Sequence, residues 1–406
     1  MKILLVHQNF PGQFLHLAPA LVARGHEVIA LTDEKNQRES DITTLRYRSP
    51  EPRPDPEQTR FATTYAEMTD RAHRVARAAR QLRDRHGFMP DVVFGHGGWG
   101  ETLFLPEVWP EARLLVYAEL YYAPRGLDVG FDPEFTNPAP ERADAVIARQ
   151  GHQALMMAQA HGALSPTEFQ ADTFPACFRD KITIIHDGVD TARLRPDPTA
   201  EVTLPSGRRF AAGDELVTFI NRNLEPYRGY HSFMRALPEV LRARPQAQVV
   251  IIGGDDVSYG ARPAGARSWK EIFLDEVRDR LDLSRVHFTG KVPYPTFVGL
   301  MQATRVHCYL TVPFVLSWSM LEAMSAGALV VGSRTAPVEE LITDGVNGRL
   351  VDFFDTGEIA ETLIEGLAQP QDFREMRRQA RAHIVENYDL GSICLPRLID
   401  FVEGRI

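Results

Sequence analysis

Short apolar runs alternate with longer amphipathic segments along most of this chain. Runs that are apolar throughout, rather than at every second position, are typical of strands in a parallel sheet covered on both faces. Strands are predicted at 2–7, 26–32, 91–96, 113–122, 162–167 and 181–186, and again at 216–220, 248–253, 286–289, 306–310 and 328–331. This βα alternation predicts two doubly wound, Rossmann-like α/β domains.

Amphipathic segments between these runs predict the helices, at 13–24, 140–160, 229–243, 268–281, 296–302, 317–327, 356–368 and 372–387. A further helix is predicted around the arginine-rich segment 71–85. Such a basic helix can touch an anionic membrane surface. However, acidic residues reduce the positive charge of this helix, and its apolar side is mostly alanine. Both features favour a solvated face with intrahelical ion pairs. Peripheral contact with a membrane is the alternative.

The segment 194–214 is polar, contains three prolines and two glycines, and has no apolar period. It is predicted as the linker between domains. We therefore expect an N-terminal domain over 1–195 and a C-terminal domain over 196–387, with a final helix at about 388–406 packing back on the first domain. The Pro-rich segment 47–58 is expected to be a surface loop.

Composition excludes several classes of protein. Lys and Arg total 45 against 54 Asp and Glu, and the net charge of -9 argues against a nucleic-acid binder. Three distant cysteines, Cys177, Cys308 and Cys394, lack metal-ligand spacing and suit a reducing compartment. No apolar run is long enough to span a membrane, and the N-terminal run is too short for a signal peptide. A cytoplasmic protein is expected.

Functional groups are expected where parallel strands end, because ligands of open α/β sheets bind outside the carboxyl ends of the strands. His96 ends one strand and is followed by Gly97 and Gly98, which allow close approach of a ligand. The alternative is a turn histidine bonded to a carbonyl. One strand further on, Glu119 and Tyr121 either line an acceptor pocket or close the domain edge.

The segment Thr311–Gly327 follows a buried strand and opens a helix that Ser317 or Ser319 can cap. A helix start points N–H groups and a positive dipole at one spot, which suits an anion. Arg222 and Arg228 follow the first strand of the same domain, and paired guanidinium groups suit a diphosphate. Glu322, inside the helix, suits two vicinal ribose hydroxyls. These residue types predict a nucleotide-diphosphate site.

The chain resembles the retaining glycosyltransferases of family 4, which have the two-domain GT-B fold. The resemblance covers essentially the whole length, and it is most specific in the segments 185–190, 286–292 and 317–327, with Asn221–Gly229 and the Phe10-Pro-Gly12 turn in support. It implies two domains that face each other across a cleft and the transfer of a sugar from a nucleotide-diphosphate donor, UDP- or GDP-linked, to a glycan, lipid-linked or small-molecule acceptor, as in polysaccharide biosynthesis.

The resemblance also implies roles for individual residues. Arg222 and Arg228 would hold the donor diphosphate, Arg228 standing where a lysine is usual, and Glu322 would bind the ribose. His96 would contact the donor sugar near its reacting carbon. The remaining donor contacts would come from backbone: the base at Lys291 and Val292, and the distal phosphate at Leu316, Ser317 and Gly12.

One departure from the family pattern concerns the donor sugar. The family usually carries two glutamates eight positions apart, and the first falls at Phe314 in this chain. Phenylalanine cannot accept a hydrogen bond from a sugar, so the sugar must be oriented differently. No cofactor and no metal ion is expected, because two arginines and a helix start can stabilise the departing diphosphate. A catalytically degenerate partner subunit, a nucleotide-sugar epimerase and a sugar phosphorylase are the alternatives.

Overall fold

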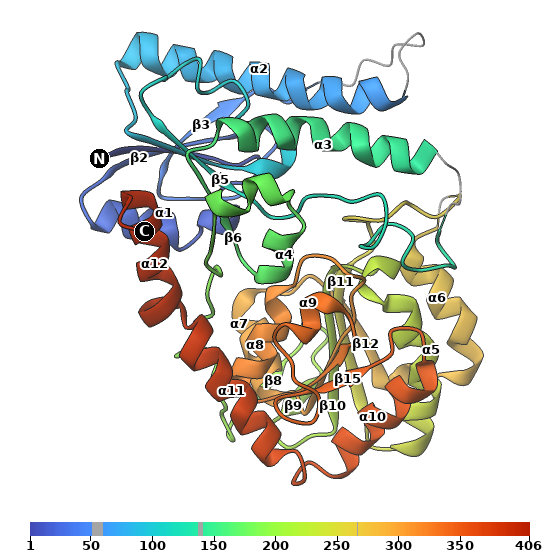
Figure 1. Ribbon diagram of the computed structural model, residues 1–406. Helices are drawn as coiled ribbons and strands as arrows, with labels where there is room; N and C mark the ends of the chain where they lie inside the picture. The colour runs from blue at the N-terminus through green and yellow to red at the C-terminus, as the bar shows by residue number, and fades with distance from the viewer. Residues whose placement is uncertain (51–59, 137–140, 266) are drawn as a thin grey trace. The chain divides into compact units, whose positions relative to one another are not determined.

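The computed structural model describes residues 1–50, 60–136, 141–265 and 267–406. The chain forms two compact units (Figure 1). Unit 1 comprises Met1–Asp187 and Gly391–Ile406, and unit 2 comprises Gly188–Leu390. The sequence prediction placed these borders at 195/196 and at about 388. The first border instead lies at Gly188, whose φ of 91° is one that glycine adopts readily.

Unit 1 contains a parallel sheet in the order β3-β2-β1-β4-β5-β6-β7. Its strands are β1 (Lys2–Val6), β2 (Glu27–Asp33), β3 (Thr43–Tyr47), β4 (Val92–His96), β5 (Arg113–Tyr117), β6 (Gly162–Ser165) and β7 (Ile182–Ile184). The sequence prediction missed β3. That strand lies at the sheet edge and, except for Tyr47, keeps its residues at least partly exposed, so it has no continuous apolar run.

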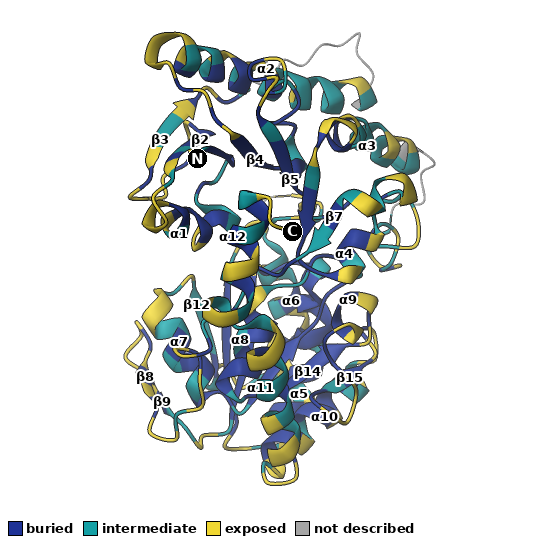
Figure 2. Cartoon of the chain, turned by 60° about the vertical axis from the view of Figure 1, so that its left-hand side comes forward, coloured by how far each residue is buried: buried dark blue, intermediate teal, exposed yellow. Residues whose placement is uncertain are grey.

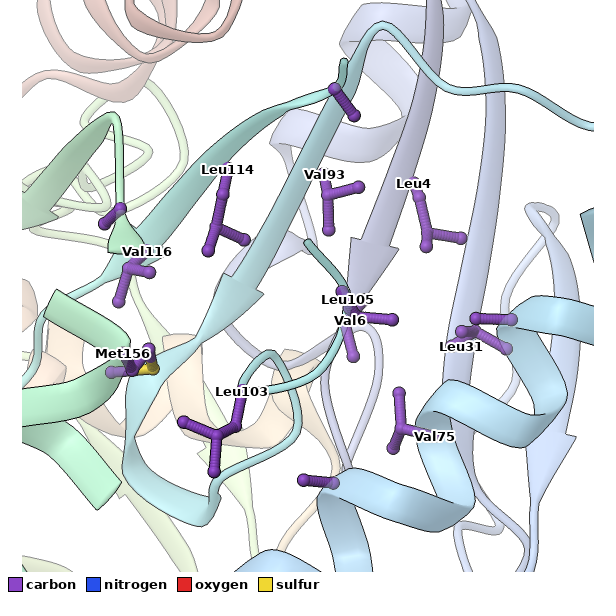
Figure 3. Packing of buried hydrophobic residues seen from close by; sticks show 14 of the residues in the cluster. Leu4, Val6, Leu31, Val75, Val93, Leu103, Leu105, Leu114, Val116 and Met156 are labelled. Carbon is purple, nitrogen blue, oxygen red and sulfur yellow. The ribbon is translucent and has the colours of Figure 1, made fainter. Parts of the chain in front are cut away.

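Alternate residues of β1 are buried on opposite faces of the unit 1 sheet. Leu4 and Val6 belong to one core cluster with side chains of α2 (Arg60–His86) and α3 (Glu141–Gln159), among them Val75 and Met156, which Figure 3 labels. Ile3 packs in a second core with side chains of α1 (Leu17–Ala23) and α12 (Leu395–Glu403). The sheet is therefore buried on both faces, as the continuous apolar runs predicted.

Several arginines of α2 have acidic partners. Arg71 lies 3.5 Å from the Asp33 carboxylate, and Arg74 pairs with Asp70 at 2.9 Å across one helical turn. Two arginines of the predicted basic face therefore make ion pairs, one of them within the helix. The short helices of this unit include α4 (Glu168–Asp172) and the 3-10 helices Gly12–Phe14, Gly97–Trp99 and Ala176–Lys181.

Unit 2 contains a second parallel sheet in the order β12-β11-β10-β13-β14-β15. Its strands are β10 (Leu216–Asn223), β11 (Gln248–Gly254), β12 (Val286–Gly290), β13 (Val306–Tyr309), β14 (Leu329–Ser333) and β15 (Arg349–Val351). The prediction ended the strands at Val331 and so missed β15. This edge strand is three residues long and follows a polar turn, which leaves almost no periodic signal.

The segment predicted as a linker is partly folded. It contains an antiparallel hairpin of β8 (Glu201–Thr203) and β9 (Arg209–Ala211), whose Val202 and Phe210 are buried in the unit 2 core. Two three-residue strands are too short to show a period of two, so the sequence pattern concealed them.

Seven helices are described in unit 2: α5 (Tyr230–Ala243), α6 (Trp269–Val277), α7 (Tyr294–Ala303), α8 (Trp318–Ala326), α9 (Ala336–Glu339), α10 (Thr356–Ala368) and α11 (Arg374–Tyr388). In Figure 2 the central strands are mostly dark blue, because their residues are buried, and the outward-facing parts of the helices are yellow, because they are exposed. Within the described ranges, no helix has the length and hydropathy required to cross a membrane.

Candidate functional site

His96 ends β4 at the carboxyl edge of the unit 1 sheet, and its side chain is 1% exposed. Its Nδ1 accepts a hydrogen bond of 3.0 Å from the Gly98 N–H, so in the neutral ring the proton is on Nε2. The ring stacks on Trp99, with centroids 4.2 Å apart. These contacts fix the ring and direct an N–H donor from Nε2.

A chain of side chains leads from His7 to that donor. His7 Nε2 lies 2.7 Å from Gln13 Oε1, and Gln13 Nε2 donates to Glu119 Oε1 at 3.0 Å. The other oxygen of Glu119 lies 3.5 Å from His96 Nε2, which is beyond a direct hydrogen bond. The network holds the Glu119 carboxylate in front of the His96 donor.

Gly12 is part of the same edge. Its φ is +49°, and a Cβ at this position would lie 2.5 Å from His7 Nε2. Only glycine lets the backbone pass so close to the histidine ring. The structure therefore places Gly12 beside the network that contains Glu119.

A pocket opens at this edge within unit 1, and we call it the unit 1 pocket. The side chains that line it include His96, Trp99, Tyr117, Glu119, Tyr122, Arg149, Gln153, Met156 and Phe174. Tyr121, which the sequence suggested for this pocket, instead belongs to the hydrophobic core and packs on Phe174 at 5.4 Å between ring centroids. The next residue, Tyr122, lines the pocket, because neighbouring residues of an extended segment point to opposite sides.

In unit 2, Arg228 is brought onto the loop that precedes α8. Its Nη1 donates to Thr311 Oγ1 and to the Val315 carbonyl, both at 2.8 Å. Gly229 makes this approach possible: its φ is +64°, and a Cβ there would lie 2.3 Å from Leu310 Cβ. The loop and the arginine therefore form one constellation, as the sequence predicted from their residue types.

The Arg228 guanidinium is 5% exposed, yet none of the described carboxylates lies within 4.0 Å of it. The buried Glu225 carboxylate attracts the guanidinium from a longer distance. Burial of a charge without a directly paired counter-ion is nevertheless costly. The aromatic rings of Tyr259 and Phe314 lie 5.2 and 5.6 Å from the guanidinium carbon and supply part of the missing stabilisation. A bound anion would balance the positive charge of the Arg228 guanidinium.

The loop that carries Tyr259 is held by Glu225, which is fully buried. Its carboxylate accepts hydrogen bonds from the N–H groups of Ser258 at 3.0 Å, Tyr259 at 3.3 Å and Gly260 at 3.0 Å. Nothing in the sequence pattern singled out Glu225 or Tyr259. The only signal was an acidic residue inside an otherwise basic turn next to Arg228.

The start of α8 differs in detail from the prediction. Ser317 is the N-cap residue, but its side chain makes no capping hydrogen bond. Its N–H donates to Tyr309 Oη at 2.7 Å, so this amide already has a partner. Within the first helical turn, the Met320 N–H donates to the Ser317 carbonyl at 3.3 Å. A helix start still directs N–H groups and a positive dipole toward one spot, which together with the Leu316 N–H suits an anion.

Glu322 lies in the second turn of α8 and is half-buried. Burial raises the pKa of its carboxyl to about 7, although the hydrogen bond from Tyr294, at 3.4 Å, acts in the opposite direction. The carboxylate therefore changes charge near neutral pH. Arg222, Lys291 and Val292 lie in the same unit; the first two are exposed, and the structure brings neither into contact with Arg228.

Phe314, at the position of the expected glutamate, is 2% exposed and packs in an aromatic cluster. Its ring meets Tyr227 edge to face, with centroids 5.4 Å apart, and lies 4.8 Å from the ring of Tyr259. The side chain thus covers Arg228 and points into the protein. The Phe314 ring packs over the guanidinium of Arg228. A glutamate at this position would compete with a bound anion for that guanidinium.

We expect Phe314→Leu to lower the free energy of unfolding by about 1 kcal/mol, since it keeps an apolar side chain but removes two aromatic contacts. Turnover should stay within about threefold, because the hydrogen bonds of Arg228 to Thr311 and Val315 remain. Urea unfolding and initial rates measure both. The exposed Phe354 gives the control, Phe354→Leu, and a Phe314 variant indistinguishable from it would contradict the packing role.

No group of three or more His, Cys, Asp or Glu side chains that could hold a metal ion occurs among the described residues. In unit 2 the charged groups are the guanidinium of Arg228 and the carboxylate of Glu322, which can hold an anion and a diol through hydrogen bonds. In unit 1 the carboxylate of Glu119 can accept a hydrogen bond from a hydroxyl group.

Two family models match the chain, one in each half. The model described as glycosyl transferase family 4 group matches residues 24–194, and that described as glycosyl transferases group 1 matches residues 214–369. Together they include His96, Arg228 and Glu322. These three residues therefore lie within the matched segments, whereas Gly12 precedes the first of them.

Curated relatives are similar over half or more of the chain. D-inositol 3-phosphate glycosyltransferase of Nocardia farcinica is 25% identical over 244 residues, which are 59% of this chain and 49% of the relative. Glycogen synthase of Mycobacterium tuberculosis is 23% identical over 97% of this chain and 92% of its own. A GDP-mannose-dependent phosphatidylinositol monomannoside mannosyltransferase of Mycolicibacterium smegmatis is 26% identical, over 59% of this chain and 61% of the relative.

Solved structures share the fold over the full length. Sucrose-phosphate synthase from Thermosynechococcus elongatus superposes with a TM-score of 0.72 at 16% identity, covering 100% of both chains. Anabaena HepE, in complex with UDP and glucose, gives a TM-score of 0.67 at 14% identity and covers 100% of both chains. These likenesses establish the two-domain GT-B fold.

Proposed function

We propose a specific reaction for this chain, which belongs to the glycosyltransferases of family 4, group 1. The enzyme would transfer a sugar from a nucleotide-diphosphate donor, with retention of the anomeric configuration and without a divalent metal ion. The transferase activity itself follows from the family. The donor class, the stereochemistry and the independence from metal are the proposal. The acceptor is a hydroxyl group of a glycan, a lipid-linked glycan or a small molecule.

The observation that carries the proposal is the buried Arg228 guanidinium without a carboxylate partner among the described residues. A donor diphosphate would supply the missing counter-charge. Leaving-group departure concentrates negative charge on that diphosphate, and a fixed guanidinium stabilises this charge more in the transition state than in the ground state. This differential stabilisation is what lowers the barrier.

The neighbouring groups suit the rest of the donor. The N–H groups at the start of α8 and of Leu316 would meet the distal phosphate, and the carboxylate of Glu322 would accept hydrogen bonds from two ribose hydroxyls. Arg222 is exposed and would add a second guanidinium to the diphosphate. Lys291 and Val292 would meet the base through their backbone, which leaves the choice of base open.

His96 is proposed to act as a hydrogen-bond donor to the sugar. Its Nδ1 is occupied by the Gly98 N–H, so Nε2 carries the proton in the neutral ring and cannot accept one from the attacking hydroxyl. The reaction is proposed to pass through an oxocarbenium-like transition state in which the departing diphosphate, rather than a side chain, receives the acceptor proton. Gly12 would keep the backbone open on the same side.

The named relatives and structural neighbours support this choice of donor. Anabaena HepE is seen with UDP, and the Mycolicibacterium smegmatis relative is named as dependent on GDP-mannose. HepE is also seen with UDP-glucose, and UDP-glucose and GDP-mannose are both nucleotide-diphosphate sugars. Two curated relatives are named for different acceptors, D-inositol 3-phosphate and a phosphatidylinositol monomannoside, which fits an acceptor that each chain recognises by its own residues.

A donor panel tests the proposal. The full-length protein is incubated with UDP-, GDP- and ADP-sugars and a mixture of acceptors, with and without EDTA, and the product is followed by NMR. We expect one donor to be consumed equally in EDTA and the new glycosidic bond to keep the anomeric configuration of the donor. An inverted product or a strict need for a divalent cation would overturn the mechanism.

The buried Phe314 is the one feature that favours a degenerate partner subunit. Such a subunit would bind no nucleotide-sugar in calorimetry, whereas an epimerase would return the donor with one inverted sugar carbon. The same donor panel therefore separates these alternatives from a transferase.

A further inference from the structure

We propose that the unit 1 pocket binds the acceptor and that this acceptor is a small hydroxylated ring carrying an anionic phosphate or carboxylate group, which Arg149 recognises. The inference rests on the proposed function, because a transferase requires an acceptor, and it adds the chemical class that the proposal left open. Its basis is a set of side chains that all line one pocket within unit 1.

Gln153 supplies the first part of the argument. It lies on α3, lines the pocket and is 3% exposed. Its Nε2 donates to the Leu120 carbonyl at 2.8 Å, which fixes the orientation of the amide, while its Oε1 is buried and has no hydrogen-bond partner. A buried acceptor without a donor costs free energy, and a ligand hydroxyl would satisfy it.

His96, which we propose contacts the donor sugar, lines the same pocket, so in the absence of donor its Nε2 can be offered to the acceptor. Its Nε2 is likewise buried without a hydrogen-bond partner, and its proton is directed by the Gly98 contact on Nδ1. The pocket therefore presents one unsatisfied acceptor, Gln153 Oε1, and one unsatisfied donor, His96 Nε2. Hydroxyl groups serve both, because each can donate and accept.

Arg149 gives the pocket its charge selectivity. Its guanidinium carbon lies 4.2 Å from the centroid of the Tyr122 ring, and its Nη2 lies 3.4 Å from Tyr122 Oη. Among the carboxylates of the described ranges none forms an ion pair with it. Stacking leaves the edge of the guanidinium available, and that edge matches a phosphate or a carboxylate.

Aromatic side chains form part of the pocket wall. Trp99 and Phe174 present aromatic surface to the pocket, against which the C–H face of a sugar or cyclitol packs. A neutral sugar would satisfy Gln153 and His96 but leave Arg149 without a counter-charge. An anionic sugar satisfies all three, which is why we favour it.

The test measures binding of three probes to the full-length protein by calorimetry and saturation-transfer NMR, in the absence of donor. The probes are glucose 6-phosphate, glucuronate and glucose. We expect at least one anionic sugar to bind at least roughly tenfold more tightly than glucose, the size of one charge-assisted contact. The first two probes distinguish a phosphate from a carboxylate.

Variants assign the preference to Arg149. In Arg149→Met the anionic and neutral sugars should bind with affinities within about threefold of each other. Arg142→Met, on the same helix but outside the pocket, should leave the preference unchanged. Gln153→Glu, which keeps an acceptor and adds a negative charge, should weaken anionic sugars more than glucose.

The inference is overturned if no anionic sugar binds more tightly than glucose, including the case in which none of them binds, or if the preference survives Arg149→Met. Donor consumption is scored separately in the same preparations. Failure here with an active donor site leaves the proposed function standing, and selective acceptor binding without any donor use would count against the proposed function alone.

Discussion

Arg228→Ala is expected to reduce kcat/KM by about thirtyfold or more, equivalent to a loss of roughly 2 kcal/mol of transition-state stabilisation. The variant removes the charge that faces the departing diphosphate. It also leaves the Val315 carbonyl and the Thr311 hydroxyl, which Arg228 contacts at 2.8 Å, without their donor. Initial rates over a range of donor concentrations measure the effect, and most of it should fall on kcat.

Two further variants separate charge from folding. Arg228→Lys keeps a cation and should recover part of the lost rate, to within about tenfold of the parent protein, although it cannot bond to Thr311 and Val315 with the same geometry. Arg242→Ala removes an exposed arginine from α5 and should change nothing. Turnover of Arg228→Ala within a factor of two of the parent protein would refute the role of Arg228 in donor activation.

The strands of this fold could be predicted from the sequence wherever helices cover both faces of the sheet. β1 is apolar from Ile3 onward and β13 is buried along its whole length, because helices cover the sheet on either side. The strands that escaped, β3 and β15, lie at sheet edges, where half-exposed or very short segments carry no continuous apolar run. The β8–β9 hairpin escaped because three residues are too few to show a period.

The candidate site was predictable as a list of residues but not as a set of contacts. Residue types and motif spacing singled out Arg228 and Glu322. They could not show that Tyr309 serves both the Ser317 N–H and Arg228, because the residues of the latter contact are 81 positions apart in the chain. Such contacts follow from the parallel pairing of β10 with β13, which brings the ends of distant strands together.

The unit 1 pocket shows the same limit. His96 was predictable from its place at a strand end between glycines, whereas Gln153 is a buried amide in the middle of an amphipathic helix. A single polar residue on the buried face of a helix is ordinarily satisfied by the core. Only the free Oε1 and its position on the pocket wall distinguish Gln153, and both depend on tertiary structure.

Glu322→Gln is expected to weaken donor binding by roughly tenfold or more at pH 8, because it replaces a charged acceptor of two ribose hydroxyls by a neutral amide. The parent protein should also show a pH dependence that the variant lacks. Burial raises the pKa of Glu322 to about 7, so the carboxylate is largely protonated at pH 6 and ionised at pH 8. Donor affinity of the parent protein should therefore rise across this range.

Stability should change in the opposite sense. The folded-state pKa of Glu322 lies above its ordinary value of 4.5, so the folded protein holds a proton that the unfolded chain releases. This contribution to stability is present below about pH 4.5 and is lost as the pH rises through about 7. Calorimetric titrations with a nucleotide-diphosphate donor and urea unfolding at pH 6 and 8 measure both effects, with Glu361→Gln on the exposed face of α10 as the control. Donor affinity that is independent of pH in the parent protein, or unchanged in Glu322→Gln, would show that Glu322 does not bind the ribose.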